Sequence, residues 1–282
     1  MIVCSILWHL HFELFEPTTE GRCATLLALI TEGTEPAQTM NDADIQQYRD
    51  DGYVVFSALV AGQKLISFRN ILQELVVRAQ TLESSRDGLH LQPDGEGNLI
   101  PGRLFKTQGV CVVEPRLLDL ARDPQIVSHV GTLLGSQLHM FGSKFFPMLA
   151  RGGTSTGGHQ DNHYFGTNSD QIVSCGIYLE DADHSNGCLR VIPGSHHTKE
   201  LVEHSFGQSD YAHGSWAEVD ESRAVDVKCP AGTVVLFSAN ILHGTTTNTS
   251  DRSRFSTAWH YIPAELDLER FRYGEYEDRH SI

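Results

Sequence analysis

The sequence lacks the paired cysteines that form a disulfide framework or a zinc site. Its six cysteines are scattered over 282 residues without a CxxC pair, which predicts reduced, packed thiols in a cytoplasmic compartment. No apolar run approaches the length that spans a bilayer. The first fifteen residues have no basic segment before their apolar part, so we expect neither a membrane anchor nor a secretory signal.

Positive charge is also scarce. The chain has 21 Lys and Arg against 36 Asp and Glu, which gives a formal net charge of −15. Nucleic acids and acidic membranes bind basic surfaces, so this charge predicts neither as a partner. A small-molecule substrate is the partner that we expect, and a small anion in a locally basic pocket remains compatible with the overall charge. No pattern in the sequence predicts an oligomeric state.

Residues 1–39 differ in character from the rest of the chain. A mixed apolar segment leads into Thr-Glu-Gly-Thr-Glu-Pro at 31–36, which has the composition of a linker. We therefore interpret residues 1–39 as an N-terminal extension and a candidate for disorder. A single folded domain is expected over residues 40–282, with Met40 at its start.

The first third of that domain alternates helical and extended patterns. Apolar residues recur at three- and four-residue spacing over 64–82, which predicts an amphipathic helix. Asp123-Pro124 and Gly135 mark the two ends of another helix. The remaining expectations here are a short helix over 41–49, a strand over 52–56 and a loop over 87–102.

After Gly135 the chain consists of short extended segments separated by turn-forming residues. We expect strands at 138–149, 160–165, 172–179, 188–192, 225–228, 233–237 and 255–261. Many short strands at this spacing are typical of a β-sandwich or barrel. The connection over 198–223 is long and poor in apolar residues, which favours a lid or loop over the barrel mouth. Tyr211 and Trp216 within it are candidates for substrate contact.

One short stretch, residues 158–165, carries the clearest chemical signal. It reads Gly-His-Gln-Asp-Asn-His-Tyr-Phe. If it forms a strand, side chains alternate between faces, so His159 and Asp161 point the same way. One imidazole and one carboxylate supply two of the three ligands of the site that non-haem iron(II) oxygenases use. By itself this spacing is weak, because about one such match arises by chance in a chain this rich in His and Asp.

The third ligand candidate lies downstream. His243 follows directly after the apolar segment 233–237, so it lies at the end of an expected strand. Arg254 comes eleven residues later, where its planar guanidinium is suited to binding a carboxylate in a bidentate way. Thr245 adds a hydroxyl donor. His159, Asp161 and His243 would together complete the triad of metal ligands.

The ordered motifs resemble those of a known family. In chain order they are His159-Gln160-Asp161, His163-Tyr164-Phe165, Asn186-Gly187-Cys188-Leu189, Val191-Ile192-Pro193-Gly194-Ser195-His196, Leu242-His243-Gly244 and Arg254. Over residues 41–264 the chain looks like the phytanoyl-CoA dioxygenase family of iron(II)/2-oxoglutarate oxygenases. The resemblance implies a mainly β fold with flanking helices, namely a double-stranded β-helix or cupin-like jelly roll.

The resemblance also implies a site and cofactors. Iron(II) would be bound by His159, Asp161 and His243, and Arg254 would bind the distal carboxylate of 2-oxoglutarate with Thr245 as a second contact. Dioxygen would be the oxidant, and the products would be succinate, CO2 and a hydroxylated substrate. Family members that halogenate have a small residue in place of the carboxylate ligand, so Asp161 favours hydroxylation.

Further polar residues are candidates with open roles. Lys106 and Gln108 share a face if their segment is a strand, and the matching stretch in the family borders the active site. Either Lys106 or Lys144 would bind 2-oxoglutarate or an anionic substrate group, although a solvated lysine is an equal alternative. His163 shares the face of Asp161 if the strand continues, but a structural histidine is as reasonable. Asn162 is a further substrate candidate, although its side chain faces away in that case.

Three functions compete at this point. The leading hypothesis is a hydroxylase of a small polar metabolite, of the amino-acid, quaternary ammonium or aminoalkyl phosphonate type. An acyl-CoA 2-hydroxylase like the family's namesake is the alternative, and the lack of a concentrated basic patch near the motifs argues against it. A metal-binding jelly roll without catalysis is the third, and Arg254 is the residue that such a module does not need.

Overall fold

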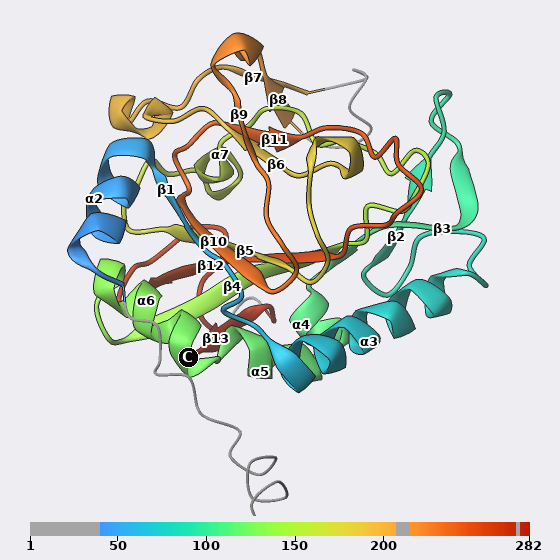
Figure 1. The fold of residues 1–282 in the computed structure, drawn as a ribbon, viewed down its shortest axis with the longest axis horizontal. Coiled ribbons are helices and arrows are strands. Elements are labelled where there is room, and N and C mark those ends of the chain that lie inside the picture. The colour runs from blue at the N-terminus through green and yellow to red at the C-terminus, as the bar shows by residue number, and fades with distance from the viewer. Residues whose placement is uncertain (1–39, 207–214, 275–276) are drawn as a thin grey trace, which may run out of the picture. The chain divides into compact units, whose positions relative to one another are not determined.

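A computed structural model describes residues 40–206, 215–274 and 277–282. The expected N-terminal extension over 1–39 and the substrate candidate Tyr211 lie outside the described residues. Within them, an eight-stranded antiparallel sheet forms the main layer (Figure 1). Its strands, in spatial order, are β1 Tyr53–Phe56, β10 Thr233–Ser238, β5 Val173–Tyr178, β12 Ser256–Pro263, β4 Leu138–Phe146, β3 Leu99–Gln108 and β2 Leu89–Pro93, with β13 Arg279–Ser281 also pairing with β4.

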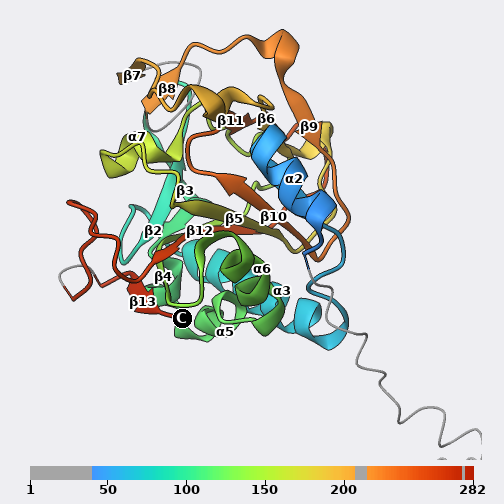
Figure 2. The same ribbon diagram turned by 90° about the vertical axis from the view of Figure 1, so that its left-hand side faces the viewer.

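A second, smaller sheet faces the main one on the side away from the long helices (Figure 2). It contains β11 His243–Thr245, β6 Leu189–Val191 and β9 Val225–Val227 in that order. A separate hairpin pairs β7 His204–Phe206 with β8 Ser215–Ala217. The expected lid over 198–223 therefore contains this hairpin, and the backbone of Ala217 donates a hydrogen bond to the Gly158 carbonyl at 2.6 Å.

Helices cover the opposite face of the main sheet (Figure 1). They are α3 Gly62–Ala79, α4 Val110–Val113, α5 Leu118–Ala121 and α6 Pro124–Leu134, while α2 Asp42–Asp51 leads into β1. The apolar stripe of α3 is buried, as its periodicity predicts, and α6 begins after the Asp123 cap and ends at Gly135. Trp259 and Tyr261 of β12 point toward this layer, because the Tyr261 hydroxyl donates to the Ala121 carbonyl at 2.6 Å.

Side-chain alternation along β12 gives the main sheet two different faces. Phe255, Trp259 and Tyr261 enter the helix-side core, whereas Arg254 just before the strand and Ser256, Ala258 and His260 within it line the space between the two sheets. The core therefore lies between the main sheet and the helices. The inner face is left for polar side chains, and the functional candidates are found there.

Two predictions about local structure are wrong. Residues 160–165 are not a strand: only Gln160 is extended, and α7 Asp161–Phe165 is a short helix closed by Gly166 in the left-handed region at φ 68°. The segment carries no apolar alternation, and an acidic residue in the first turn suits a helix. The expected loop over 87–102 is largely β2 and β3, joined by a turn in which Asp94 accepts the backbone N–H groups of Glu96 and Asn98.

The structure also bears on the predictions about cysteines and membrane-spanning segments. The four cysteines of the described residues, Cys111, Cys175, Cys188 and Cys229, are buried and free of disulfides. No helix in the described ranges combines the length and the apolar character needed to cross a bilayer.

Candidate active site

The three expected metal ligands meet between the two sheets. His159 and His243 come from segments that bridge each other, with backbone hydrogen bonds of 2.9 and 3.0 Å in both directions. The backbone at Gln160 is extended, which directs Asp161 toward the two histidines. His159 and Asp161 therefore point the same way, as predicted, although no strand continues past Gln160. One ligand atom from each of the three residues lies within 4.8 Å of the others.

The imidazoles are oriented for metal binding. His159 Nδ1 lies 2.8 Å from the Gly157 carbonyl and His243 Nδ1 lies 3.1 Å from the Ile241 carbonyl. A carbonyl only accepts, so both Nδ1 atoms carry the proton and both Nε2 lone pairs are free. These Nε2 atoms lie 3.6 and 3.8 Å from the Asp161 carboxylate oxygens. Two imidazole nitrogens and one carboxylate at this spacing fit an iron(II) ion.

Asp161 is held by a chain of buried polar groups. The Ser174 hydroxyl donates to its Oδ2 at 2.6 Å and lies 3.0 Å from His260 Nδ1, while Lys144 Nζ lies 3.3 Å from His260 Nε2. Lysine only donates, so His260 accepts at Nε2, donates from Nδ1 to Ser174, and Ser174 donates to Asp161. The hydrogen bonds in this series therefore all run in one direction and end at Asp161 Oδ2. The other carboxylate oxygen, Oδ1, takes no part in the series.

Burial controls ionisation in this cluster. Burial would raise the pKa of Asp161, but His243, His260 and His159 outweigh it and hold the pKa of this carboxyl well below its usual value. Burial lowers the pKa of His243 to about 4, and the neighbouring His159 adds to this shift. Asp161 is thus a carboxylate and His243 a neutral imidazole near neutral pH, the forms in which both bind metal.

Arg254 is buried on the inner face next to this cluster. Its side chain is 2% exposed, its Nη1 donates to Ser256 Oγ at 2.7 Å, and its guanidinium lies 5.2 Å from the ring centre of Tyr178. Its Nε has no hydrogen-bond partner, and no carboxylate of the described residues forms an ion pair with it. Burial lowers the pKa of Arg254. A guanidinium in this setting lacks the anion that normally accompanies it.

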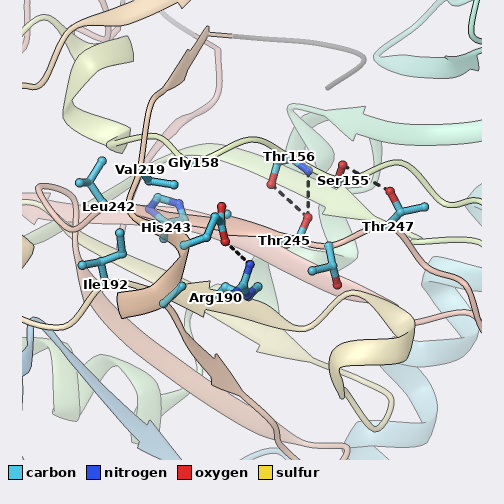
Figure 3. Close-up of a pocket in the computed structure, with 14 residues that line it drawn as sticks. Ser155, Thr156, Gly158, Arg190, Ile192, Val219, Leu242, His243, Thr245 and Thr247 are labelled. Atoms are coloured by element: carbon cyan, nitrogen blue, oxygen red, sulfur yellow. Dashed lines mark hydrogen bonds and ion pairs between the residues drawn. The ribbon is translucent and has the colours of Figure 1, made fainter. Parts of the chain in front are cut away.

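Thr245 lies on the same small sheet as His243. Its hydroxyl accepts the Thr156 backbone N–H at 2.9 Å and lies 3.2 Å from the Thr156 hydroxyl. Gly244, which lies between His243 and Thr245 in the sequence, has no room for a side chain. An added Cβ there would come within 2.8 Å of the Thr156 carbonyl oxygen. Figure 3 shows His243, Thr245 and Thr156 on the wall of a neighbouring pocket of about 340 Å³, which also includes Arg190.

A cavity of about 430 Å³ joins these groups. Its wall includes the three ligand candidates, Arg254 and Thr245, together with the predicted residues Lys106, Gln108 and Lys144. Gln108 of β3 is paired with Lys144 of β4, which in turn is paired with Ala258 of β12. Lys106 is therefore a diagonal neighbour of Lys144 on the same face, at roughly 7–8 Å between Cα atoms. Burial, with the charge of Lys144, lowers the pKa of Lys106 to about 8.

Two predicted substrate residues do not line this cavity. His163 stacks on His204, with ring centres 3.9 Å apart. The Asn162 amide is fully buried and donates to the Ser169 carbonyl and to Asn240 Oδ1 at 2.9 and 2.7 Å. The helix α7 explains the position of His163, because a strand would have placed this side chain on the face of Asp161. Asn162 points away from the cavity, as it would also have done in a strand. Trp216 is likewise absent from the cavity wall.

The sequence reasoning missed several residues of the cavity wall. These are Tyr178, Ser256, His260, Arg270 and, behind the wall, Ser174. The sequence carried a signal for Ser256 and His260. Both lie an even number of residues from Arg254, so in a strand they are expected on the same face as Arg254. Ser174 had no such signal, because its place opposite His260 depends on pairing between β5 and β12.

Solved structures confirm the fold. The crystal structure of EctD from S. alaskensis with 2-oxoglutarate and 5-hydroxyectoine matches with a TM-score of 0.65 at 18% identity, over 82% of this chain and 78% of that chain. The same architecture, two facing antiparallel sheets with helices outside, is present here. The predicted jelly roll is therefore correct.

Fold, metal-ligand geometry and relatives together define the class of the protein: it is an iron(II)- and 2-oxoglutarate-dependent oxygenase. A family model described as phytanoyl-CoA dioxygenase (PhyH) matches residues 48–256. The chain belongs to the phytanoyl-CoA dioxygenase family, as its motifs predict.

Curated relatives agree with this assignment. Phytanoyl-CoA dioxygenase domain-containing protein 1 of Danio rerio is 24% identical over 80% of this chain and 91% of its own length. A protein of Stutzerimonas stutzeri, named as a probable alpha-ketoglutarate-dependent hypophosphite dioxygenase, is 23% identical over 82% of each chain. The names of these relatives differ in substrate, so the family does not by itself define the substrate of this chain.

Proposed function

We propose that this protein hydroxylates a C–H bond of a small polar metabolite, with iron(II) held by His159, Asp161 and His243. When bound, the metal with 2-oxoglutarate and dioxygen supplies the oxidation and yields succinate and CO2. The cavity of about 430 Å³ is of the size that takes a small ligand and leaves little room for an acyl-CoA. The carboxylate at Asp161 occupies the position that halogenation would need to be open.

The observation that carries the proposal is the guanidinium of Arg254, which is buried without a carboxylate partner. It lines the same cavity as the unprotonated Nε2 atoms of His159 and His243. A metal-binding module without a co-substrate has no use for a desolvated cation at this point. A dicarboxylate that reaches from the metal to Arg254 satisfies both features, because it supplies an anion at each end.

We assign the remaining polar groups to binding and positioning. Arg254 binds the distal carboxylate of 2-oxoglutarate, with Thr245 as a hydroxyl contact and Lys106 as a further cation for the co-substrate. Gln108 lies on the substrate side of the same face. Ser174 donates to the Asp161 carboxylate and His260 to Ser174, so we assign both as positioning residues.

The proposal is tested by a succinate-release screen. Purified protein is supplied with iron(II), ascorbate and 2-oxoglutarate, and each member of a panel of small polar metabolites is added in turn. We expect at least one compound to stimulate succinate formation together with a product that is heavier by one oxygen atom, and Asp161→Ala to abolish both. Absence of stimulation across the panel, combined with no binding of 2-oxoglutarate, would refute the proposal.

A further inference from the structure

The cavity wall carries a concentration of positive charge. Lys106, Lys144 and Arg254 lie on it, and Arg270 lies at its exposed rim, whereas Asp161 is the one carboxylate among its lining residues. This contrasts with the whole chain, whose formal charge is −15. Within the described ranges none of these four cations forms an ion pair with a carboxylate, although most other arginines there do.

The cofactors do not remove this excess. The argument rests on the proposed function, in which the site holds a divalent metal and the dianion of 2-oxoglutarate. Their charges cancel, so the three positive charges in excess on the wall remain after both are bound. Arg254 and Lys106 are assigned to the co-substrate, which leaves Lys144 and Arg270 without an anion.

Lys144 has a donor available for a ligand. Its ammonium donates to the Gly142 carbonyl at 3.2 Å and to His260 Nε2 at 3.3 Å. An ammonium has three N–H donors, so one remains. Burial lowers the pKa of Lys144, whereas the charges of Asp161 and Asp278 act to raise it. Asp278 is bonded to Ser143 on the opposite face of β4. It therefore does not enter the cavity.

The surroundings of Lys144 give space for a ligand close to the metal ligands. Gly142 precedes it on the same face, and its strand partner Ala258 is in register with Gly176 of β5. Ala258 and Gly176 are small and line the cavity, which leaves its floor open beside the ammonium, whereas the space above Gly142 is taken by the His260 ring. The chain from Lys144 through His260 and Ser174 to Asp161 shows that this place adjoins the metal site.

We propose that the substrate carries an oxyanion, a carboxylate or a phosphonate, that binds to the ammonium of Lys144 beside the metal. Arg270, which donates one N–H to the Tyr164 carbonyl at 2.8 Å, has further donors at the rim and attracts the same anion as it enters. The C–H bond that reacts thus belongs to an acidic metabolite. A purely cationic quaternary ammonium compound, one of the candidates that the sequence suggested, does not suit this wall.

The test uses the full chain loaded with manganese(II), which does not turn over, and saturating 2-oxoglutarate. Methylphosphonate and acetate are titrated as oxyanion probes, and paramagnetic relaxation of their 31P and 13C nuclei reports binding near the metal. Tetramethylammonium is the cationic comparison. The variants are Lys144→Met, Lys144→Arg and, as a matched loss of one exposed lysine, Lys228→Met.

We expect saturable binding of at least one oxyanion and none of tetramethylammonium. Lys144→Met should weaken the oxyanion about tenfold or more, Lys144→Arg should retain part of the affinity, and Lys228→Met should leave it unchanged. 2-Oxoglutarate should bind Lys144→Met within about threefold of the wild-type protein, since no contact to it is assigned to this residue. Manganese affinity is measured separately for each variant, because Lys144 also holds Asp161 through His260 and Ser174.

Several results would overturn the inference. One is an absence of oxyanion binding to the loaded wild-type protein, and another is equal binding by Lys144→Met. A loss of 2-oxoglutarate affinity in Lys144→Met that matches the loss of oxyanion affinity would instead assign Lys144 to the co-substrate. If the wild-type protein bound neither manganese nor 2-oxoglutarate, the proposed function itself would fall together with this inference.

Discussion

Arg254 is the residue whose environment says most about function. A desolvated guanidinium without a carboxylate is unfavourable in the ligand-free protein, since burial of an unpaired charge opposes folding. We predict that Arg254→Met raises the dissociation constant of 2-oxoglutarate about 100-fold, from the loss of charge-assisted hydrogen bonds. The same change should leave the free energy of unfolding of the ligand-free protein unchanged or higher. Isothermal titration and thermal unfolding measure the two effects separately.

Arg252 provides the control for that experiment. It lies two residues away, is half exposed, and is bonded to Asp183 at 2.6 Å. Arg252→Met should change 2-oxoglutarate affinity less than twofold, because surface ion pairs contribute little. If Arg254→Met destabilised the protein and left 2-oxoglutarate binding intact, the guanidinium would have a structural role.

We predict that Lys106 makes co-substrate binding depend on pH. Its pKa in the ligand-free protein is lowered to about 8 by burial and by Lys144. Below pH 8 it is an ammonium that attracts a carboxylate, and above pH 8 it is neutral, so kcat/KM for 2-oxoglutarate should fall as the pH rises through about 8. Lys106→Arg keeps its charge over this range and should remove the fall. An unchanged pH profile in Lys106→Arg would show that another group titrates.

At the scale of the element, β5 contributes an open floor to the cavity. Gly176 lies on its inner face, where an added Cβ would make only ordinary contacts with Tyr178 and Phe237, at 3.6 and 3.9 Å. We predict that Gly176→Val folds with an unfolding temperature equal to or above that of the wild-type protein, because valine suits a strand. Succinate formation should fall about tenfold or more, because the side chain fills ligand space. Full activity in this variant would place the ligand elsewhere.

The elements also show what sequence reasoning reached and where it failed. The periodicity of α3 and the caps of α6 are local signals, and the structure confirms both. The helix α7 was missed because the strand assignment of 160–165 relied on His159 and Asp161 pointing the same way. One extended residue between them, Gln160, is enough to give that arrangement. The hairpin of β2 and β3 was missed because pairing, and not composition, makes its strands.

At the scale of the whole molecule, positive charge is scarce overall, yet one cavity is lined by four cationic residues and one carboxylate. Lys106, Lys144, Arg254 and Arg270 are far apart in the chain and meet only because β3, β4 and β12 are neighbours in the sheet and the chain end folds back over its inner face. Net charge could not reveal this arrangement, so an acidic substrate could not be preferred from the sequence alone. The clustering of His159, Asp161 and His243, with Arg254 on the wall of the same cavity, could be predicted because each residue belongs to a short motif.

The central claim is that iron(II) and 2-oxoglutarate occupy one site built from His159, Asp161, His243 and Arg254. Anaerobic titration of the iron-loaded protein with 2-oxoglutarate tests it most directly, because a co-substrate that chelates the metal gives a weak visible charge-transfer band. We predict a saturable band in the wild-type protein, its loss in Asp161→Ala, and its displacement to much higher 2-oxoglutarate concentration in Arg254→Met. A wild-type protein without the band, or a band unaffected by both substitutions, would contradict the account.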